Sequence, residues 1–497
     1  MLATLWLPSP WLALSLTAPS AHAASSEVGP GDDLNTVLSS LQPGDVITFT
    51  GGTYDLDGTL YWTGVGTAEE PIEFRALAGS PVILQNNGGG YVAQITDSQY
   101  LNLTGITFQG GGDIEYTQPS GMYIANSSNV TMQDCTVTNV WGTALRIDGN
   151  ASNLTIAHNE LSFTGDGSAI YVGCGDASCW MQDSTIEFNL IHDVQGNGIY
   201  LSPGTQASTL QHNVIFRADD TAIVLTSTEF GPQNLVYGNA IWQTEDDGIY
   251  VEGAALIQNN LLFEIGGDGI TSRSSYESLY DVQISHNTVG RTEGWAANLQ
   301  DWYDREDLVF SNNALSNPTG LGLFWDDLQY NDDYGYGTTT TSTYPDTANY
   351  ISNNVVTGLV DGFDELQRPT YVIPGGGVAD FVDIENFDYY PTAVSLVRDA
   401  ADPNGNAYIP AEDFNGTARD GTSPDAGAYE YDGDGNPGWI LQEDFKEFSP
   451  SEGRNSTGVS SGCCGAKKNE PSGTGSAALL VPVGVFGLLR RRARRGR

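Results

Sequence analysis

A short segment with a fixed pattern recurs along the middle of the chain: apolar–x–apolar–x–x–Asn–x–apolar. Its first full copy runs from Leu154 to Leu161, and two earlier copies, at Ile106 and Cys135, lack the asparagine. Successive copies follow at intervals of 21 to 30 residues, with one final interval of 41. The asparagine slot is occupied by Asn159, Asn189, Asn213, Asn239, Asn260, Asn287, Asn313 and Asn354.

A second short strand pattern follows each copy, as in Ser168-Ala-Ile-Tyr-Val and Asp247-Gly-Ile-Tyr-Val. Its alternation places aliphatic side chains on one face and polar ones on the other, and the intervening turns are rich in Gly, Asn and Asp. Several short strands per repeat predict a parallel β-helix whose coils stack about 4.8 Å apart. Stacked coils would align the asparagines in a hydrogen-bonded ladder. A leucine-rich repeat is disfavoured, because the repeat has no helical half and no Leu-x-x-Leu-x-Leu register.

The charge balance narrows the function classes. The chain has 62 acidic and 19 basic residues and a net charge of −43. Nucleic-acid binding is excluded, because phosphate recognition needs a basic face. A polyanionic substrate would need a bridging cation. The 60 glycines and scarce lysines argue against long helices, and we expect a monomer.

The two ends look like targeting segments. Residues 1–23 are apolar and end in Ala21-His22-Ala23, which is typical of a secretory signal and its cleavage site. Residues 433–461 are polar and predict a linker. Residues 462–497 combine Gly462-Cys463-Cys464, an apolar run and an arginine cluster. They resemble the myxobacterial C-terminal sorting signal of the MYXO-CTERM type.

That resemblance implies a disordered tail that anchors the protein through Cys463 and Cys464. It also implies a secreted protein retained at the outer cell surface, with membrane contact only through the tail. Cysteine use elsewhere agrees with export: Cys174 and Cys179 are close enough in sequence to form a small disulfide. Cys135 is expected to be buried and free.

Three segments resemble the secreted right-handed parallel β-helix proteins of the pectate-lyase-like superfamily. Residues 33–47 resemble their capping helix and entry strand, residues 52–54 and 66–72 their first coil, and residues 413–430 their closing strand. The resemblance implies an all-β, right-handed parallel β-helix domain over residues 24–432 with a short N-terminal capping helix. It also implies an extracellular polysaccharide as partner, although the superfamily includes lyases, hydrolases, epimerases and non-enzymes.

Equivalent residues of stacked coils form columns, and one outward column is rich in tyrosine. It predicts a sugar-binding face, because flat rings stack on sugars and charged groups bind hydroxyls; exposed tyrosines that merely suit strands are the alternative. The predicted substrate-binding residues are Arg146, Asp148, Tyr171, Tyr200, Tyr250 and Trp302. The long aromatic insertion from Trp325 to Asn349 is expected to wall this groove.

Acidic turns supply the second candidate site. Asp220, Asp246, Asp247 and Asp268 lie in successive turns, with Asp247 and Asp268 one coil apart in one column. Carboxylates so close suit Ca²⁺, or form the acid–base pair of a glycoside hydrolase. Solvated turn aspartates are the third interpretation, and all three stay open.

If the chain is an enzyme, the predicted catalytic residues are Asp247, Asp268, Glu252 and Arg273. His192-Asp193 is a further acid–base candidate. Motifs of named relatives are missing: residues 24–432 contain no lysine for a Lys/Arg lyase pair, no Gly-His-Gly and no Asp-Pro-His. The sequence therefore favours a surface protein that binds and cleaves polysaccharide by hydrolysis or elimination. A non-catalytic structural, adhesive or glycan-binding module is the alternative.

Overall fold

The computed structural model describes most of the chain between the predicted signal and the predicted tail. The described residues are 24–111, 119–226, 231–274, 279–302, 307–326 and 349–447, except 364, 367, 404–408 and 434. The predicted signal, Cys463, Cys464 and the predicted sorting tail lie outside them. Within them, no helix is long and apolar enough to cross a membrane.

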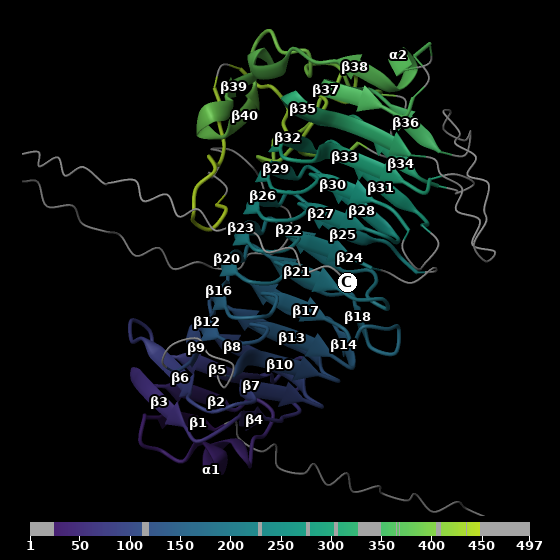
Figure 1. Cartoon of the computed structure of the whole chain (residues 1–497). Coiled ribbons are helices and arrows are strands. Elements are labelled where there is room, and N and C mark those ends of the chain that lie inside the picture. Colours follow the sequence, from purple (N-terminus) through teal and green to yellow (C-terminus); the bar gives the residue numbers. More distant parts are fainter. Residues whose placement is uncertain are drawn as a thin grey trace, which may run out of the picture. The chain divides into compact units, whose positions relative to one another are not determined.

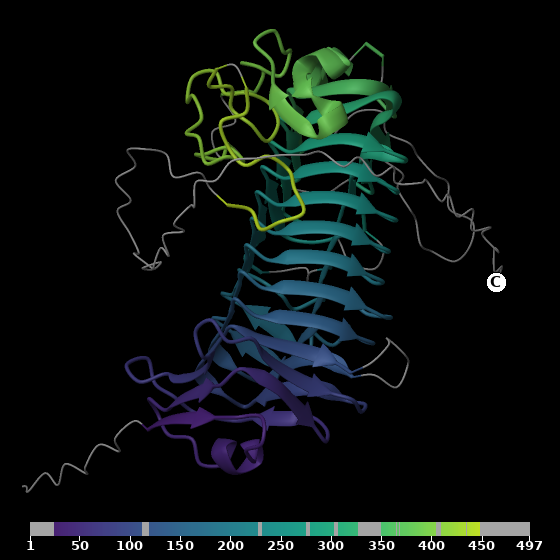
Figure 2. The same ribbon diagram turned by 90° about the vertical axis from the view of Figure 1, so that its left-hand side faces the viewer.

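The described chain winds into a right-handed parallel β-helix whose coils stack in register (Figures 1 and 2). This confirms the predicted fold class. Each typical coil contributes one strand to each of three parallel stacks.

The first stack carries the repeated segment that precedes the asparagine slot. It consists of β1 (Ser25–Val28), β2 (Val46–Phe49), β5 (Ile72–Ala76), β8 (Gln99–Thr104), β11 (Ser128–Gln133), β15 (Thr155–Ala157), β19 (Thr185–Glu187), β22 (Thr209–Gln211), β25 (Asn234–Tyr237), β28 (Ala255–Gln258), β31 (Val282–Ser285), β34 (Val309–Ser311) and β36 (Tyr350–Ser352), with β14 (Asn150–Ser152) and β18 (Trp180–Gln182) beside it.

The second stack follows the asparagine slot. It consists of β3 (Gly52–Leu56), β6 (Val82–Asn86), β9 (Ile106–Gly110), β12 (Thr136–Val140), β16 (Glu160–Thr164), β20 (Leu190–Val194), β23 (Val214–Ala218), β26 (Ala240–Thr244), β29 (Leu261–Ile265), β32 (Thr288–Thr292), β35 (Ala314–Asp326), β37 (Asn354–Asp361) and β38 (Val372–Pro374).

The third stack carries the tyrosine-rich column. It consists of β4 (Leu60–Trp62), β7 (Tyr91–Thr96), β10 (Ser120–Ala125), β13 (Leu145–Asp148), β17 (Ile170–Val172), β21 (Ile199–Leu201), β24 (Ile223–Leu225), β27 (Ile249–Val251), β30 (Ile270–Ser272), β33 (Trp295–Gln300) and the second half of β35.

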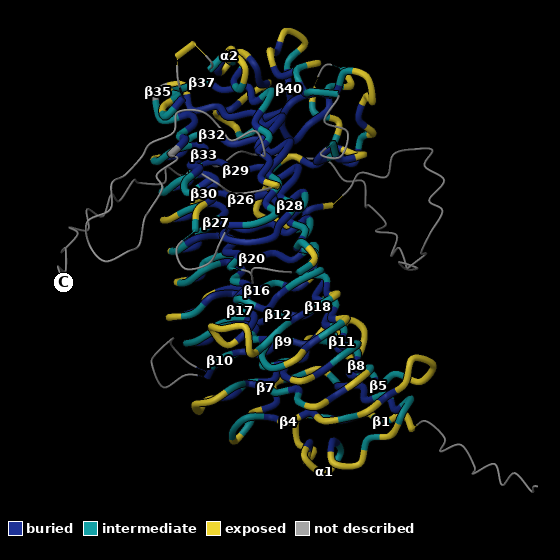
Figure 3. Tube along the Cα trace, turned by 90° about the vertical axis from the view of Figure 1, so that its right-hand side faces the viewer, coloured by how far each residue is buried: buried dark blue, intermediate teal, exposed yellow. Residues whose placement is uncertain are grey.

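Burial follows the alternation of the sequence. In β17, Ile170 and Val172 are buried while Tyr171 between them points outward, and the same pattern holds in β21 and β27. Buried positions therefore recur along the stacked strands, and exposed positions gather at turns (Figure 3). The interior is one continuous apolar core.

The asparagine ladder is present. Asn239 is fully buried; its Nδ2 donates to Asn260 Oδ1 (2.9 Å) and to the carbonyl of Leu210 (3.0 Å). Its Oδ1 accepts from the backbone N–H (2.9 Å) and Nδ2 (3.0 Å) of Asn213. The pattern repeats from Asn159 to Asn354. The side chains thus satisfy buried backbone groups at the turn between the first two stacks.

The capping helix predicted at the N-terminal end of the domain is confirmed, whereas the closing strand predicted at its C-terminal end is not. The capping helix is present as α1 (Leu34–Leu38), with Asp33 as its N-cap. The predicted closing strand over residues 413–430 is wrong: this segment forms loops with a single bridge, Glu412 to Ala418. Shorter elements precede it: α2 (Arg368–Tyr371), β39 (Phe381–Asp383) and β40 (Asp388–Pro391), with two 3₁₀ turns.

The predicted domain end at residue 432 also needs correction. Residues 435–447, drawn in yellow in Figure 2, pack against the β-helix instead of forming a polar linker. Trp439 joins a second apolar cluster on the outer face of the second stack. Lys446 is buried, with Nζ donating to the carbonyls of Gly238 (2.8 Å) and Phe414 (3.0 Å). The folded domain therefore contains a lysine after all.

Candidate active site

The outward column of the third stack has the predicted register. Strand pairing places its members directly above one another, one coil apart. They are Tyr123, Arg146, Tyr171, Tyr200, Val224, Tyr250 and Thr271.

The rings in this column face one another. Tyr171 and Tyr200 are stacked at 4° with centroids 5.0 Å apart, and the guanidinium of Arg146 lies 5.1 Å from the centre of the Tyr171 ring. Tyr171 therefore has little open ring face for stacking on a sugar, and its role in substrate binding stays a prediction. One of its faces is covered by Tyr200 and the other by Arg146.

The turns between the second and third stacks bring the acidic residues to the edge of this column. The backbone N–H of Ala222 donates to the carbonyl of Asp247 (3.0 Å), and that of Gly248 to the carbonyl of Asp268 (2.9 Å). These bonds align Thr221, Asp247 and Asp268 in consecutive coils, as predicted.

The two candidate sites are one site. A hollow of about 440 Å³ lies where the acidic turns meet the tyrosine column, and we call it the acidic hollow. Neither motif alone indicated that they share it. It is lined by Asn197, Tyr200, Asp220, Thr221, Val224, Asp246, Asp247, Tyr250, Asp268, Thr271, Arg273 and Asn298.

Asp247 and Asp268 have different surroundings. Burial raises the pKa of Asp247 from 3.8 to about 6, opposed by hydrogen bonds from Thr271 and the Asp268 backbone and reinforced by the Asp268 charge. Asp268 accepts hydrogen bonds from the Trp295 backbone N–H (2.6 Å) and from Asn298 Nδ2 (2.6 Å). Two neighbouring carboxyls in unlike environments can divide acid and base roles.

Asp246 and Asp220 form a second acidic pair in the hollow. Burial raises the pKa of Asp246, and the charge of Asp220 raises it further. Asp220 accepts from the backbone N–H of Thr221 (2.9 Å). The hollow thus concentrates four carboxyl groups near one cation, Arg273.

Glu252 reaches the hollow only through Tyr250. It is 5 % exposed and is not among the described residues that line the hollow. The Tyr250 hydroxyl donates to Glu252 and accepts from Arg273 Nε (3.0 Å), and the Arg273 guanidinium lies 5.1 Å from the Tyr250 ring centre. This hydrogen bond to Tyr250 raises the pKa of Arg273, so the side chain stays cationic.

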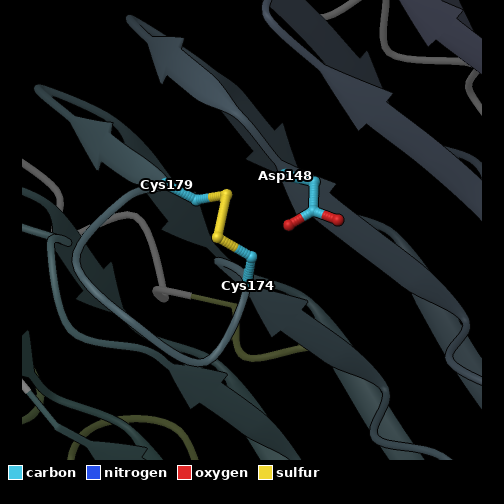
Figure 4. A group of neighbouring side chains, drawn as sticks. All are labelled: Asp148, Cys174 and Cys179. Atoms are coloured by element: carbon cyan, nitrogen blue, oxygen red, sulfur yellow. A yellow bond between two sulfur atoms is a disulfide. The ribbon is translucent and has the colours of Figure 1, made fainter.

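Arg146 and Asp148 lie on the same face but outside the hollow. Their side chains form an ion pair (3.0 Å), and the Tyr123 hydroxyl donates to the same carboxylate oxygen of Asp148 (3.5 Å). Asp148 also lies beside the expected disulfide, Cys174–Cys179, which is present with Cα atoms 5.6 Å apart (Figure 4). Disulfide sulfurs are not thiolates, so this trio is no metal site.

The acidic hollow is a poor fit for a preformed calcium site. Among the described residues, no three of its carboxyl groups bring ligand oxygens within 4.8 Å of one another. N–H donors already occupy Oδ1 of Asp247 and both oxygens of Asp268. We derive no step through a metal ion, and calcium binding stays a prediction.

Trp302 is not part of the binding face. Asp301 has φ +61°, and Trp302 after it enters the core, where it is fully buried and its Nε1 donates to Ser272 Oγ (3.1 Å). Trp325 is buried as well. The rest of the insertion that is expected to wall the groove, residues 327–348, lies outside the described residues.

His192 and Asp193 belong to an ion-pair network outside the acidic hollow. His192 Nδ1 lies 2.7 Å from Asp193 Oδ2 and its Nε2 3.4 Å from Glu160. Arg217 donates to both oxygens of Asp193 (2.7 and 2.9 Å) and also pairs with Glu443 of the C-terminal segment. The pair is held by these ion pairs and lies outside the acidic hollow.

Sequence reasoning missed two polar residues of the hollow. The missed residues are Asn197 and Asn298. Extending the columns would have found both, since Asn197 shares the column of Thr221 and Asp247, and Asn298 pairs with Thr271. Val224 was aligned in the tyrosine column, but its position between two tyrosines was given no role.

Comparisons with known proteins agree on the fold. The sequence profile of the family described as "Right handed beta helix region" matches residues 82–187 and 166–315. A search of curated proteins found no match.

Solved structures similar to this one include two lyases and one epimerase. The alginate lyase from Paenibacillus sp. str. FPU-7 is 18% identical (TM-score 0.43), with 55% of this chain and 97% of that chain covered. Pectate lyase Pel9A is 12% identical (TM-score 0.48; 82% and 97% covered). The A-module of the Azotobacter vinelandii mannuronan C-5 epimerase AlgE6 is also 12% identical (TM-score 0.48; 67% and 91%). With TM-scores below 0.5, these likenesses show neither an activity nor a substrate of this chain. The strand pairing and the matched family profile show that the chain is a right-handed parallel β-helix protein.

Proposed function

We propose that this chain binds a polysaccharide across its third stack and hydrolyses it in the acidic hollow. One observation carries the proposal: Asp247, whose pKa is raised to about 6, lies one coil from Asp268 in a hollow walled by tyrosines. A carboxyl with a raised pKa keeps its proton closer to neutral pH than an ordinary aspartate does, and such an acid beside a second carboxyl is what glycoside hydrolysis requires.

The two carboxyls have distinct roles in this mechanism. Asp247 protonates the glycosidic oxygen as the leaving group departs. Asp268, held by the Trp295 N–H and the Asn298 amide, attacks the anomeric carbon or stabilises its positive charge. Water then attacks the same carbon, Asp247 as carboxylate takes up the proton of that water, and the sugar is released. Side chains one coil apart lie about 5 Å from each other, which matches the separation in retaining enzymes. Arg273 and Tyr250 bind substrate hydroxyl groups at the same wall.

Elimination is less well supported. A lyase needs a base that removes a proton beside a carboxylate, and the cation in the hollow, Arg273, is held protonated by Tyr250. Lys446 has a pKa lowered by burial, but it lies against Gly238 and Phe414 and not in the hollow. Hydrolysis therefore fits these side chains better.

The proposed setting is the outside of the cell. The N-terminal segment that resembles a secretory signal, the cysteine–arginine tail and the Cys174–Cys179 disulfide support export and retention at the surface.

The test is a polysaccharide screen on the purified protein, following new reducing ends and the absorbance of unsaturated products. We expect reducing ends without unsaturation, and a loss of about 100-fold or more in turnover for Asp247→Asn and Asp268→Asn. Asp219→Asn is the matched control, because Asp219 lies in the same turn as Asp220 but lines a neighbouring hollow. Unsaturated products would show that the protein cleaves by elimination and not by hydrolysis. Binding without products would show that it is a glycan-binding module.

A further inference from the structure

The aromatic column is interrupted inside the acidic hollow. Strand pairing places Tyr200 opposite Val224 and Val224 opposite Tyr250. All three residues line the hollow. Val224 is 7 % exposed and lies in the column between the two tyrosines.

The width of this interruption follows from the coil spacing. One coil below, Tyr171 and Tyr200 are adjacent in the column and stack with centroids 5.0 Å apart. Tyr200 and Tyr250 are two coils apart, so their rings are separated by about 10 Å. One six-membered ring placed midway would lie about 5 Å from each tyrosine, which is ordinary stacking distance.

We propose that the interruption at Val224 is a subsite for one pyranose ring, held between Tyr200 and Tyr250. The sugar takes the place that a tyrosine side chain occupies in neighbouring coils. This inference rests on the proposed function, since it specifies which part of the glycan the hollow takes and of what chemical class.

The rim of the subsite selects sugars without carboxylates. Asp220, Asp246 and Asp247 face the hollow, where they accept hydrogen bonds from hydroxyl or ammonium groups. A uronate would bring a further negative charge among these groups. Arg273, the cation among the lining residues, is bound to Tyr250. Both neutral and amine-bearing sugars satisfy this chemistry.

The test fills the subsite with protein. Val224→Tyr places a ring between Tyr200 and Tyr250, and the column already accepts tyrosines in the same strand position. Gln94→Tyr is the matched control: Gln94 also lies between two tyrosines of this column, Tyr61 and Tyr123, and outside the hollow. Binding of cellohexaose, a glucosamine hexamer and hexagalacturonate is measured by calorimetry, and folding by circular dichroism and thermal melting.

We expect the wild-type protein to bind cellohexaose or the glucosamine hexamer more tightly than hexagalacturonate. Val224→Tyr should weaken that binding roughly tenfold to a hundredfold, from the loss of two ring contacts, while Gln94→Tyr leaves it unchanged. If Val224→Tyr fails to fold, Tyr200→Ala, which removes one wall, should weaken the same binding about tenfold.

The outcomes separate this inference from the proposed function. Wild-type affinity retained by folded Val224→Tyr, or by Tyr200→Ala, overturns the subsite and leaves the glycan function standing. Preference for hexagalacturonate overturns the sugar class. A wild-type protein that neither binds nor cleaves any glycan in this set or the wider screen overturns the proposed function and the subsite with it.

Discussion

Replacing Asp247 by Asn should make the protein more stable at neutral pH while it abolishes hydrolysis. Burial raises the pKa of this carboxyl from 3.8 to about 6 in the folded protein. The folded state therefore binds the Asp247 proton more tightly than the unfolded chain does. Wild-type stability falls as the pH rises from about 4 to about 6, because the ionised carboxylate is the form that the fold disfavours. Asn imitates the protonated form at every pH.

The magnitude follows from the same values. A rise from 3.8 to about 6 corresponds to about 3 kcal/mol at full effect. Asp247 is partly exposed at the hollow, so solvent screening reduces the expected gain to about 1–2 kcal/mol. The gain should be complete above about pH 6 and absent below about pH 4.

Urea unfolding followed by tryptophan fluorescence at pH 4, 5.5 and 7.5 measures this difference. Asp193→Asn serves as a control of opposite sign, because Arg217 lowers the pKa of Asp193 to about 2. That variant should lose stability at pH 7.5. A stability difference for Asp247→Asn that is unfavourable, or equal at pH 4 and 7.5, would refute the assigned environment.

Three further predictions concern the framework. Asn239→Ala leaves buried partners in the ladder unsatisfied and should cost about 2–4 kcal/mol by urea unfolding, against less than about 0.5 kcal/mol for the exposed Asn150→Ala. Trp439→Ala should cost about 3 kcal/mol and open residues 435–447 to proteolysis, whereas an unaltered digestion pattern would restore the linker interpretation. The Cys174–Cys179 bridge closes only a short loop, so its reduction should lower stability by no more than about 2 kcal/mol; the Cys174→Ser, Cys179→Ser double variant should show no change in its unfolding midpoint on adding reductant.

The regular part of the fold is readable from the sequence because its determinants are local. Alternation decides which side chain of a strand points inward, as in Ile170, Tyr171 and Val172. Because the coils stack in register, residues that are one repeat apart in the sequence contact each other. Asn159 and Asn189, 30 residues apart, therefore meet in the ladder. The same arithmetic places Asp247 beside Asp268.

Deviations from the repeat could not be read in this way. Asp301 adopts a left-handed conformation that turns Trp302 into the core, and nothing in the local pattern distinguishes it from an exposed loop aromatic. Residues 435–447 have a linker-like composition, yet they pack on apolar side chains that the second stack leaves on its outer face, including Phe216 and Trp242.

The sequence by itself determined the coil, its register and the order of residues in each column, because stacking at a constant spacing leaves one arrangement for side chains that alternate. Tertiary structure alone decided that the acidic turns and the tyrosine column meet in one hollow, that Tyr250 lies between Glu252 and the hollow, and that burial raises the pKa of Asp247. Those properties depend on how neighbouring turns exclude water and share hydrogen bonds, and no single coil contains that information.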